Sequence, residues 1–198
     1  SVIRYASLKF VFSLCVYFIS QMYISSKITS EFATWVDSKI QNIALKRKKC
    51  LILDLDNTLW GGVLGEEGIN GIQIGGDYPG KAFLYFQEAL SALSKEGIIL
   101  SVCSKNNEED VFEAWEQNPF MVLRKKDFVA IRINWNDKAS NIVELSKELN
   151  IGLDSMVFID DNPAERELVK QTLPMVAVPD FPKQAYMLPQ FFMQLVRD

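Results

Sequence analysis

Apolar and polar positions follow a regular alternation along most of this chain. From residue 50 onward, short apolar runs typical of buried strands are each followed by a longer stretch whose apolar residues recur at helical spacing. The predicted strands cover 50–56, 98–104, 128–133, 155–159 and 175–178. The predicted helices cover 80–95, 108–117, 137–149 and 190–196, and another begins at Asn162-Pro163. Because strands that alternate with helices indicate βαβ units, we expect an α/β fold: a Rossmannoid parallel sheet of about five strands with helices on both faces.

Two more helices are predicted before this alternation, at about 10–19 and 30–46. The first contains the apolar run FVFSLCVYFI, which is shorter than the roughly 20 residues that a membrane span needs. It favours a helix packed against the domain or a neighbour, and a signal or membrane segment is the alternative. The second ends in a basic run at 46–49, which is typical of a solvated helix end but also suits a phosphate or a membrane surface.

The same pattern divides the chain into three parts. We expect an N-terminal helical segment at 1–48, a core at 49–182, and a C-terminal helical tail or linker at 183–198. Because the sequence starts at Ser1 rather than Met, we also expect it to be part of a longer chain with further domains.

Composition then excludes several classes of chemistry. A net charge of -4 argues against a general nucleic-acid binder. The absence of His excludes His catalysis and His metal ligands. The three cysteines form no CxxC pair and two lie in apolar runs, which fits buried thiols in a reducing compartment and thus a cytoplasmic location. We therefore expect neither nucleic acid nor a membrane as a partner.

Polar side chains of complementary kinds follow four successive predicted strands. The carboxyl ends of parallel strands lie at one edge of a sheet, where ligands bind in such folds. The groups are Asp54 and Asp56, then Ser104, Lys105 and Asn106, then Asn136, Asp137 and Lys138, and finally Asp160, Asp161 and Asn162. Any one group alone is typical of an ordinary turn or helix cap, but all four in this order predict a site for phosphoryl chemistry.

A divalent metal ion is the first component of this predicted site. Up to four carboxylates share the edge: Asp54, Asp56, Asp160 and Asp161. Like charges at that range cannot all stay ionised unassisted. Since the available ligands are oxygens, the hard cation Mg²⁺ is the expected cofactor, and it keeps open positions for water and phosphate.

A phosphoryl group is the second component. The ammonium of Lys138 and the hydroxyl of Ser104 suit its oxygens, and Lys105 and Asn106 are further candidate phosphate-binding residues. One aspartate can attack phosphorus and form an aspartyl phosphate. A second can protonate the leaving oxygen and later activate water.

The same motifs resemble those of the haloacid dehalogenase (HAD) superfamily: DLDNT at 54–58, Ser104, Lys138 and Asp160-Asp161. More narrowly, LDLDNTLWGGVLGEEG, SKNNE, INWNDKASNI and FIDDNPAERE resemble the FkbH-like domain of HAD subfamily IIIC, over about 49–179. The resemblance implies that Asp54 is the nucleophile and a Mg²⁺ ligand. It also implies that Asp56 is the general acid and base, with its backbone carbonyl on the metal.

The resemblance assigns the remaining motif residues as well. Asp160 would be the main metal ligand after the fourth strand, with Asp161 nearby. Ser104 and Lys138 would hold the phosphoryl group, so Lys138 counts among the catalytic residues, and Thr58 would support the nucleophile loop.

A capless core is expected from the gaps between motifs. HAD enzymes usually select substrates with an inserted cap domain. Here the gap between Asp56 and residue 80 holds seven glycines and is too short for a domain, so it predicts a glycine-rich flap. The gap between Ser104 and Lys138 is already filled by a predicted helix and strand. An uncapped site is open enough for the tethered phosphate of a macromolecule or for a partner protein. The expected substrate is a phosphorylated small molecule or a group bound to a carrier protein.

The sequence is compatible with three functions. The first is a Mg²⁺-dependent phosphatase or phosphotransferase acting on a phosphoric ester or an acyl phosphate. The second, implied by the FkbH-like resemblance, is transfer of a glyceryl group from 1,3-bisphosphoglycerate to an acyl carrier protein. That transfer needs a thiol, and strand alternation turns Cys103 toward the core. The third is a non-catalytic phosphate-binding module of a larger biosynthetic protein.

Overall fold

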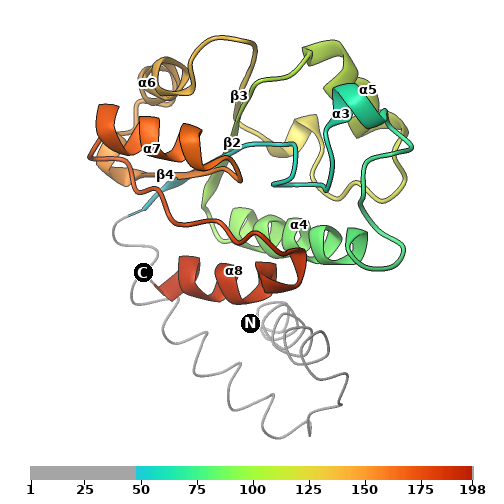
Figure 1. The fold of residues 1–198 in the computed structure, drawn as a ribbon. Coiled ribbons are helices and arrows are strands. Elements are labelled where there is room, and N and C mark those ends of the chain that lie inside the picture. Colours follow the sequence, from blue (N-terminus) through green and yellow to red (C-terminus); the bar gives the residue numbers. More distant parts are fainter. Residues whose placement is uncertain (1–47, 198) are drawn as a thin grey trace, which may run out of the picture.

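A four-stranded parallel sheet forms the centre of the computed structural model, which describes residues 48–197 (Figure 1). The predicted N-terminal helices lie outside these residues. The strands run in the order β3-β2-β1-β4. Their bounds are Cys50–Leu53 for β1, Ile99–Ser104 for β2, Ala130–Ile133 for β3 and Met156–Ile159 for β4. Leu53 is in register with Val102 on one side and Ile159 on the other, so the polar residues that follow β1 and β4 start at the same level of the sheet.

Helices cover both faces of the sheet, which confirms the predicted α/β class. The helices are α3 (Leu64–Glu67), α4 (Gly80–Lys95), α5 (Glu108–Gln117), α6 (Lys138–Leu149), α7 (Pro163–Thr172) and α8 (Leu188–Arg197). Three short 3₁₀ turns add η1 (Lys125–Asp127), η2 (Leu153–Ser155) and η3 (Ala185–Met187). In Figure 1, α4 and α8 lie on one side of the sheet and α6 and α7 on the other.

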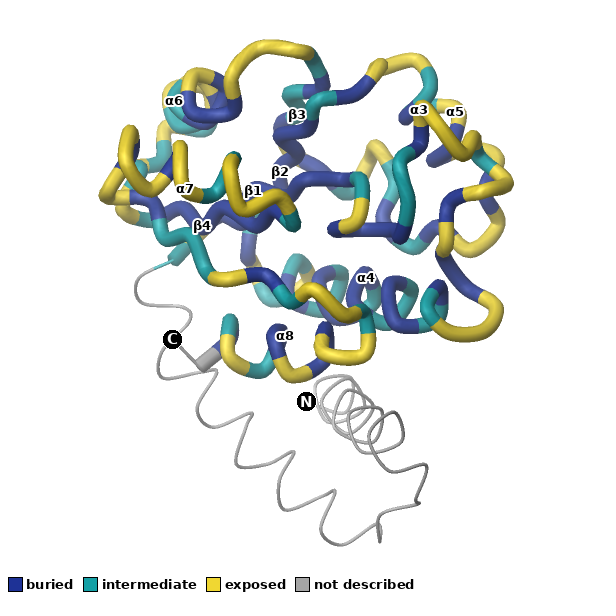
Figure 2. The backbone as a smooth tube through the Cα atoms, viewed as in Figure 1, coloured by how far each residue is buried: buried dark blue, intermediate teal, exposed yellow. Residues whose placement is uncertain are grey.

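Two hydrophobic clusters follow from the alternation of side chains along the strands. Leu51 and Leu53 face the cluster that contains α4, α5 and α8, whereas Cys50 and Ile52 face the cluster under α6 and α7. Because both faces are covered, every residue of β1 and β4 is buried, and Figure 2 shows this buried centre in dark blue. The strands are therefore held from both sides, and their ends are rigid positions for functional groups.

The predicted fifth strand at 175–178 is wrong. The segment makes a single parallel bridge between Ala177 and Val157. The amide of Phe158 donates to the carbonyl of Ala177 at 2.8 Å, and the amide of Ala177 donates to Met156 at 3.1 Å. Pro174 and Pro179 flank the segment, and proline has no N–H with which to extend a ladder, so the pairing stops after one residue.

The glycine-rich flap is a packed loop that contains only the short helix α3. Its apolar side chains are buried in the main cluster: Leu59, Trp60, Leu64, Ile72 and Ile74. Gly61 and Gln73 exchange backbone hydrogen bonds of 3.0 and 2.8 Å, and a Cβ on Gly61 would lie 2.9 Å from atoms of Gln73 and Phe83. Gly62 adopts φ +91°, a conformation that favours glycine. Between β2 and β3 lie only α5 and η1, so the described residues form a capless core, as predicted.

The C-terminal helix α8 packs against α4. Its apolar stripe of Leu188, Phe191, Phe192 and Val196 is buried in the main cluster. The ring of Phe191 lies 6.1 Å from that of Phe86 on α4. The predicted division at residue 183 stays a prediction, but α8 packs as part of the core. Across the described residues, every helix is too short or too polar to cross a membrane.

Candidate active site

Three charged side chains from distant parts of the sequence meet at the carboxyl end of the sheet. Asp54 directly follows β1, Asp160 directly follows β4, and Lys138 is the first residue of α6. Nζ of Lys138 lies 2.6 Å from Oδ2 of Asp160 and 3.0 Å from Oδ1 of Asp54. All three residues are nearly inaccessible, with 3% exposure for Lys138, 6% for Asp54 and 0% for Asp160. The backbone amide of Asp54 donates to Ile159 at 2.9 Å, which fixes the two strand ends to each other.

Asp161 completes a group of three carboxylates. Asp54, Asp160 and Asp161 each offer an oxygen atom, and these atoms lie within 4.8 Å of one another. Oδ1 of Asp54 is buried and accepts no hydrogen bond from the described residues, although the Lys138 ammonium is close. With one ammonium against three carboxylates, the group has an excess of negative charge when all are ionised. A group of carboxylate oxygens with an excess of negative charge fits a hard divalent cation such as Mg²⁺.

The pKa values of the group reflect this crowding. Burial, followed by repulsion from Asp54, raises the pKa of Asp160 to about 6. The same two causes raise the pKa of Asp161 to about 6. Burial alone would lower the pKa of Lys138, but the adjacent carboxylates of Asp54 and Asp160 outweigh it and raise that pKa. Lys138 is therefore a permanent cation, whereas Asp160 and Asp161 gain protons in mildly acidic conditions.

The carboxylate of Asp56 is held apart from this group by three hydrogen-bond donors. Oδ1 accepts from the indole Nε1 of Trp60 at 2.9 Å and from the amide of Leu64 at 3.0 Å. Oδ2 accepts from Nδ2 of Asn106 at 2.9 Å. Burial raises the pKa of Asp56, and these three hydrogen bonds oppose that rise. Of the four carboxylates predicted to share the site, three come together, and ligation by the Asp56 backbone carbonyl stays a prediction.

The three predicted site residues at the end of β2, residues 104–106, have different contacts. Ser104 is buried at the end of β2, and its carbonyl accepts from the amide of Asn134 at 3.1 Å. Nζ of Lys105 lies 2.6 Å from Oε1 of Glu165 on α7. The side-chain amide of Asn106 donates to Asp56, as described above. The polar atoms of Lys105 and Asn106 are thus used for protein contacts, and phosphate binding by these two residues stays a prediction.

Two residues fix the turn that carries Asp160 and Asp161. The hydroxyl of Thr58 accepts from the amide of Asp161 at 3.1 Å, which links the turn to the loop after β1 as the resemblance implied. Nη1 of Arg166 donates to the carbonyls of Asp160 at 2.8 Å and Asp161 at 2.6 Å. Arg166 was not among the predicted site residues. A signal existed, because Arg166 belongs to the FIDDNPAERE motif on which the FkbH-like resemblance rests.

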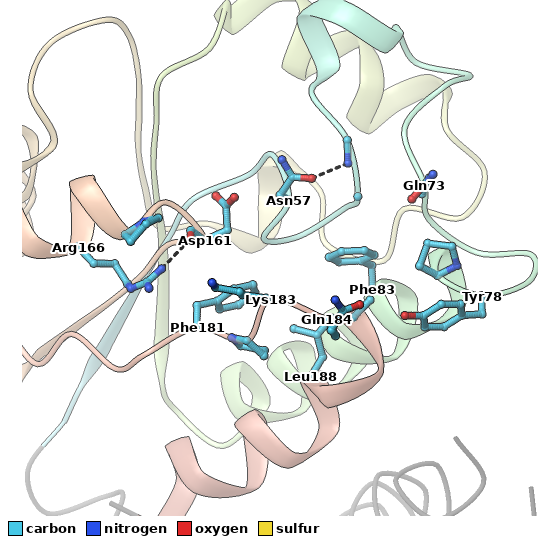
Figure 3. A pocket seen from close by; sticks show the side chains of 16 residues that line it. Asn57, Gln73, Tyr78, Phe83, Asp161, Arg166, Phe181, Lys183, Gln184 and Leu188 are labelled. Carbon is cyan, nitrogen blue, oxygen red and sulfur yellow. Dashed lines mark hydrogen bonds between the residues drawn. The ribbon is translucent and has the colours of Figure 1, made fainter. Parts of the chain in front are cut away.

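A cavity of about 480 Å³ lies beside the carboxylates (Figure 3). Asp161 and Arg166 line it at the end formed by α7, and Asn57 lines it from the loop after β1. The flap and α4 contribute Gln73, Tyr78, Pro79 and Phe83, and the segment before α8 contributes Phe181, Pro182, Lys183, Gln184, Ala185 and Leu188. Among the residues predicted for the site, only Asp161 lines this cavity. The cavity is therefore a separate space next to the buried charges.

The sequence matches the NLI interacting factor-like phosphatase family over residues 49–186. Among solved structures, the chain is similar to the N-terminal part of the protein BF1531 from Bacteroides fragilis, which contains a phosphatase domain and is complexed with Mg. The identity is 41%, the TM-score is 0.74, and the match covers 98% of this chain. It covers 52% of the other chain, so this chain spans about half of that relative.

A second, more distant likeness is to 3-deoxy-D-manno-octulosonate 8-phosphate phosphatase from Moraxella catarrhalis, at 19% identity and a TM-score of 0.43. It covers 82% of this chain and 90% of that one. No curated protein matches the sequence.

Proposed function

We propose that this chain, which belongs to the NLI interacting factor-like phosphatase family of the HAD superfamily, is a Mg²⁺-dependent phosphohydrolase acting through an aspartyl phosphate on Asp54. The observation that carries the proposal is the buried Lys138 ammonium between Asp54 and Asp160, in a group of three carboxylates. The 41% identical relative from Bacteroides fragilis, which contains a phosphatase domain and is complexed with Mg, supports both the reaction class and the metal.

The metal would be held by Asp54, Asp160 and Asp161, whose oxygens lie close enough to share one ion. When bound, Mg²⁺ supplies positive charge that offsets the three carboxylates and the phosphoryl oxygens. Thr58 and Arg166 hold the turn that positions Asp160 and Asp161, because both bind its backbone. Lys138 keeps its proton and adds the fixed positive charge that a transferred phosphoryl group requires.

The reaction has two steps. In the first, a carboxylate oxygen of Asp54 forms a bond to phosphorus as the bond to the leaving oxygen breaks, and Asp56 gives that oxygen a proton. In the second, water attacks the aspartyl phosphate, Asp56 takes the proton, and phosphate and free Asp54 are regenerated. Lys138 and the Ser104 hydroxyl stabilise the charge on the phosphoryl oxygens in both steps. Trp60 and Asn106 stabilise the ionised form of Asp56, which suits its task as the base of the second step.

Replacing Asp54 by Asn tests the proposal. We expect Asp54→Asn to lower kcat for p-nitrophenyl phosphate by about a thousandfold or more, because the amide is a poor nucleophile. Far-ultraviolet circular dichroism of the variant should match the parent chain. Parent-level turnover by a folded Asp54→Asn variant would contradict the proposal. As a matched control, Asp154→Asn changes an exposed aspartate beyond the site and should keep full activity.

A second candidate is the transfer implied by the FkbH-like resemblance, in which a glyceryl group passes to an acyl carrier protein. Support comes from the length of the relative, since this chain spans only about half of it. Cys50 and Cys103 are fully buried, and burial raises their pKa values to about 11 and about 12. An attacking thiol would therefore come from the carrier or from another part of the protein. Mass spectrometry of a carrier protein incubated with 1,3-bisphosphoglycerate tests this candidate, and an unchanged carrier mass contradicts it.

A non-catalytic phosphate-binding module is the third candidate. It predicts binding of phosphate and Mg²⁺ without hydrolysis of any ester in a broad panel, whereas turnover of a single ester excludes it. A cytoplasmic location is proposed from the two buried, unpaired thiols of the described residues, which fit a reducing compartment.

A further inference from the structure

The cavity beside the carboxylates has a lining distinct from the phosphoryl site. Asp54, Ser104 and Lys138 are absent from its lining, and Asp161 is the residue that the two share. A phosphoryl group held at Asp54 would therefore leave the cavity to the rest of the substrate. A volume of about 480 Å³ falls in the range of small-molecule sites.

One wall of the cavity is a short segment fixed at both ends. Phe181 packs edge-to-face on Phe191 of α8 at 5.1 Å and on Phe86 of α4 at 6.3 Å. Leu188 is buried in the same cluster. Between these anchors, Lys183 and Gln184 are exposed and line the cavity. The amide of Met187 donates to the carbonyl of Gln184 at 2.9 Å, which closes the η3 turn. The wall thus has a fixed backbone that presents polar side chains.

The two ends of the cavity differ in chemistry. Arg166 and Lys183 bring positive charge to one part of the lining, and Figure 3 shows both on the side of Asp161. Within the described part of the chain, Lys183 forms no ion pair. The lining holds one acid, Asp161, which under the proposed function is neutralised by the metal. On the opposite side in Figure 3, the cavity is lined by the half-exposed ring of Tyr78 and the largely buried ring of Phe83.

We propose that this cavity binds the leaving group and selects phosphomonoesters whose alcohol has a flat apolar body and a second anionic group, with Lys183 as the specificity-determining residue. The inference rests on the proposed phosphohydrolase function. The ring surfaces of Tyr78 and Phe83 contact the apolar body, and the second anion pairs with the ammonium of Lys183. The segment 181–188 thereby selects the substrate, as a cap domain does in other enzymes of the superfamily.

A matched pair of esters tests the proposal. The first is 4-(carboxymethyl)phenyl phosphate, and the second is its neutral carboxamide analogue, which has nearly the same shape. We expect kcat/KM to favour the carboxylate by roughly two- to fivefold, as one exposed charge-assisted contact provides. Lys183→Gln should bring that ratio close to one. Lys147→Gln, an exposed lysine on α6 outside the cavity, should keep the ratio of the parent chain.

Binding measurements separate failure of the cavity from failure of the reaction. Both esters are titrated calorimetrically into the Asp54→Asn chain, with and without Lys183→Gln. If the parent hydrolyses neither ester but Lys183 controls a binding preference for the carboxylate, the cavity is supported and the proposed function is overturned. If both esters are hydrolysed with equal kcat/KM and bound with equal Kd, or if Lys183→Gln preserves the preference, the cavity assignment is overturned and the reaction stands.

Discussion

At the strand ends, the carboxyl groups of Asp160 and Asp161 can bind either a proton or a metal ion, so the two compete. The pKa values of Asp160 and Asp161 are each raised to about 6, so in the metal-free chain both carboxyls hold protons more tightly than in the unfolded chain. A carboxyl whose pKa is raised on folding stabilises the metal-free fold. This stabilisation is complete when the pH is below the pKa of the carboxyl in the unfolded chain, and it is lost as the pH rises through about 6. Mg²⁺ requires the ionised forms, so its stabilising effect has the opposite pH dependence.

We therefore expect Mg²⁺ to raise Tm far more at pH 7.5 than at pH 5. Below pH 6, Mg²⁺ affinity should fall about tenfold per pH unit for each proton displaced. Differential scanning calorimetry with Mg²⁺ or with a chelator checks this. Asp161→Asn removes one titrating ligand. The variant should therefore bind Mg²⁺ more weakly than the parent chain at pH 7.5, and its Mg²⁺ affinity should depend less steeply on pH. An equal Tm increase at both pH values would show that these carboxyls do not bind the ion.

The donors around Asp56 define a second prediction at the residue scale. Trp60→Phe removes the indole N–H that bonds Oδ1, and so raises the pKa of Asp56 further, because a hydrogen bond to the ionised form is lost. If Asp56 is the base of the second step, the acidic limb of the pH–kcat profile moves to higher pH. Trp115→Phe is a matched control, since the indole of Trp115 is equally buried and makes no hydrogen bond among the described residues. Equal shifts in both variants would count against this role.

At the scale of elements, α8 connects the cavity wall to the core. Phe191 is 5% exposed and contacts Phe86 of α4 and Phe181 of the wall. A linker to a further domain would show little burial, whereas this helix buries a complete apolar stripe. The same helix that extends the core therefore also holds Lys183 and Gln184 in place.

Phe191→Ala should lower the free energy of unfolding by about 3–5 kcal/mol, because it leaves a cavity between α8 and α4. Urea denaturation followed by circular dichroism measures the change. Gln194→Ala, an exposed position of the same helix, should change stability by about 0.5 kcal/mol or less. If Phe191→Ala costs no more than this control, α8 does not belong to the folding unit.

At the scale of the whole molecule, the order of motifs was readable from the chain. The superfamily predicted from 54–58, Ser104, Lys138 and Asp160-Asp161 is confirmed by the family match over residues 49–186. Within residues 48–197, the parallel sheet, the helices on both faces and the capless core are also confirmed. The sheet and helices follow from local periodicity, since the burial of a residue on a strand or helix repeats with the geometry of that element. The capless core follows from the short gaps between the motifs. The fifth strand was wrong because periodicity at 175–178 could not show that flanking prolines limit the pairing to Ala177.

The residues at the carboxyl edge of the sheet could be predicted from the sequence alone, because strand direction and alternation place Asp54 and Asp160 there. The contacts that these residues make depend on the folded structure. It separated the Asp56 carboxylate from the other three, used Asn106 to support it, and brought Arg166 to the turn of Asp160 and Asp161. It also built the cavity from residues 57–83 and 161–188, two regions that are far apart in sequence. The physical reason is that periodicity depends on one element at a time, whereas hydrogen bonds, charge pairs and cavities depend on how several elements pack together.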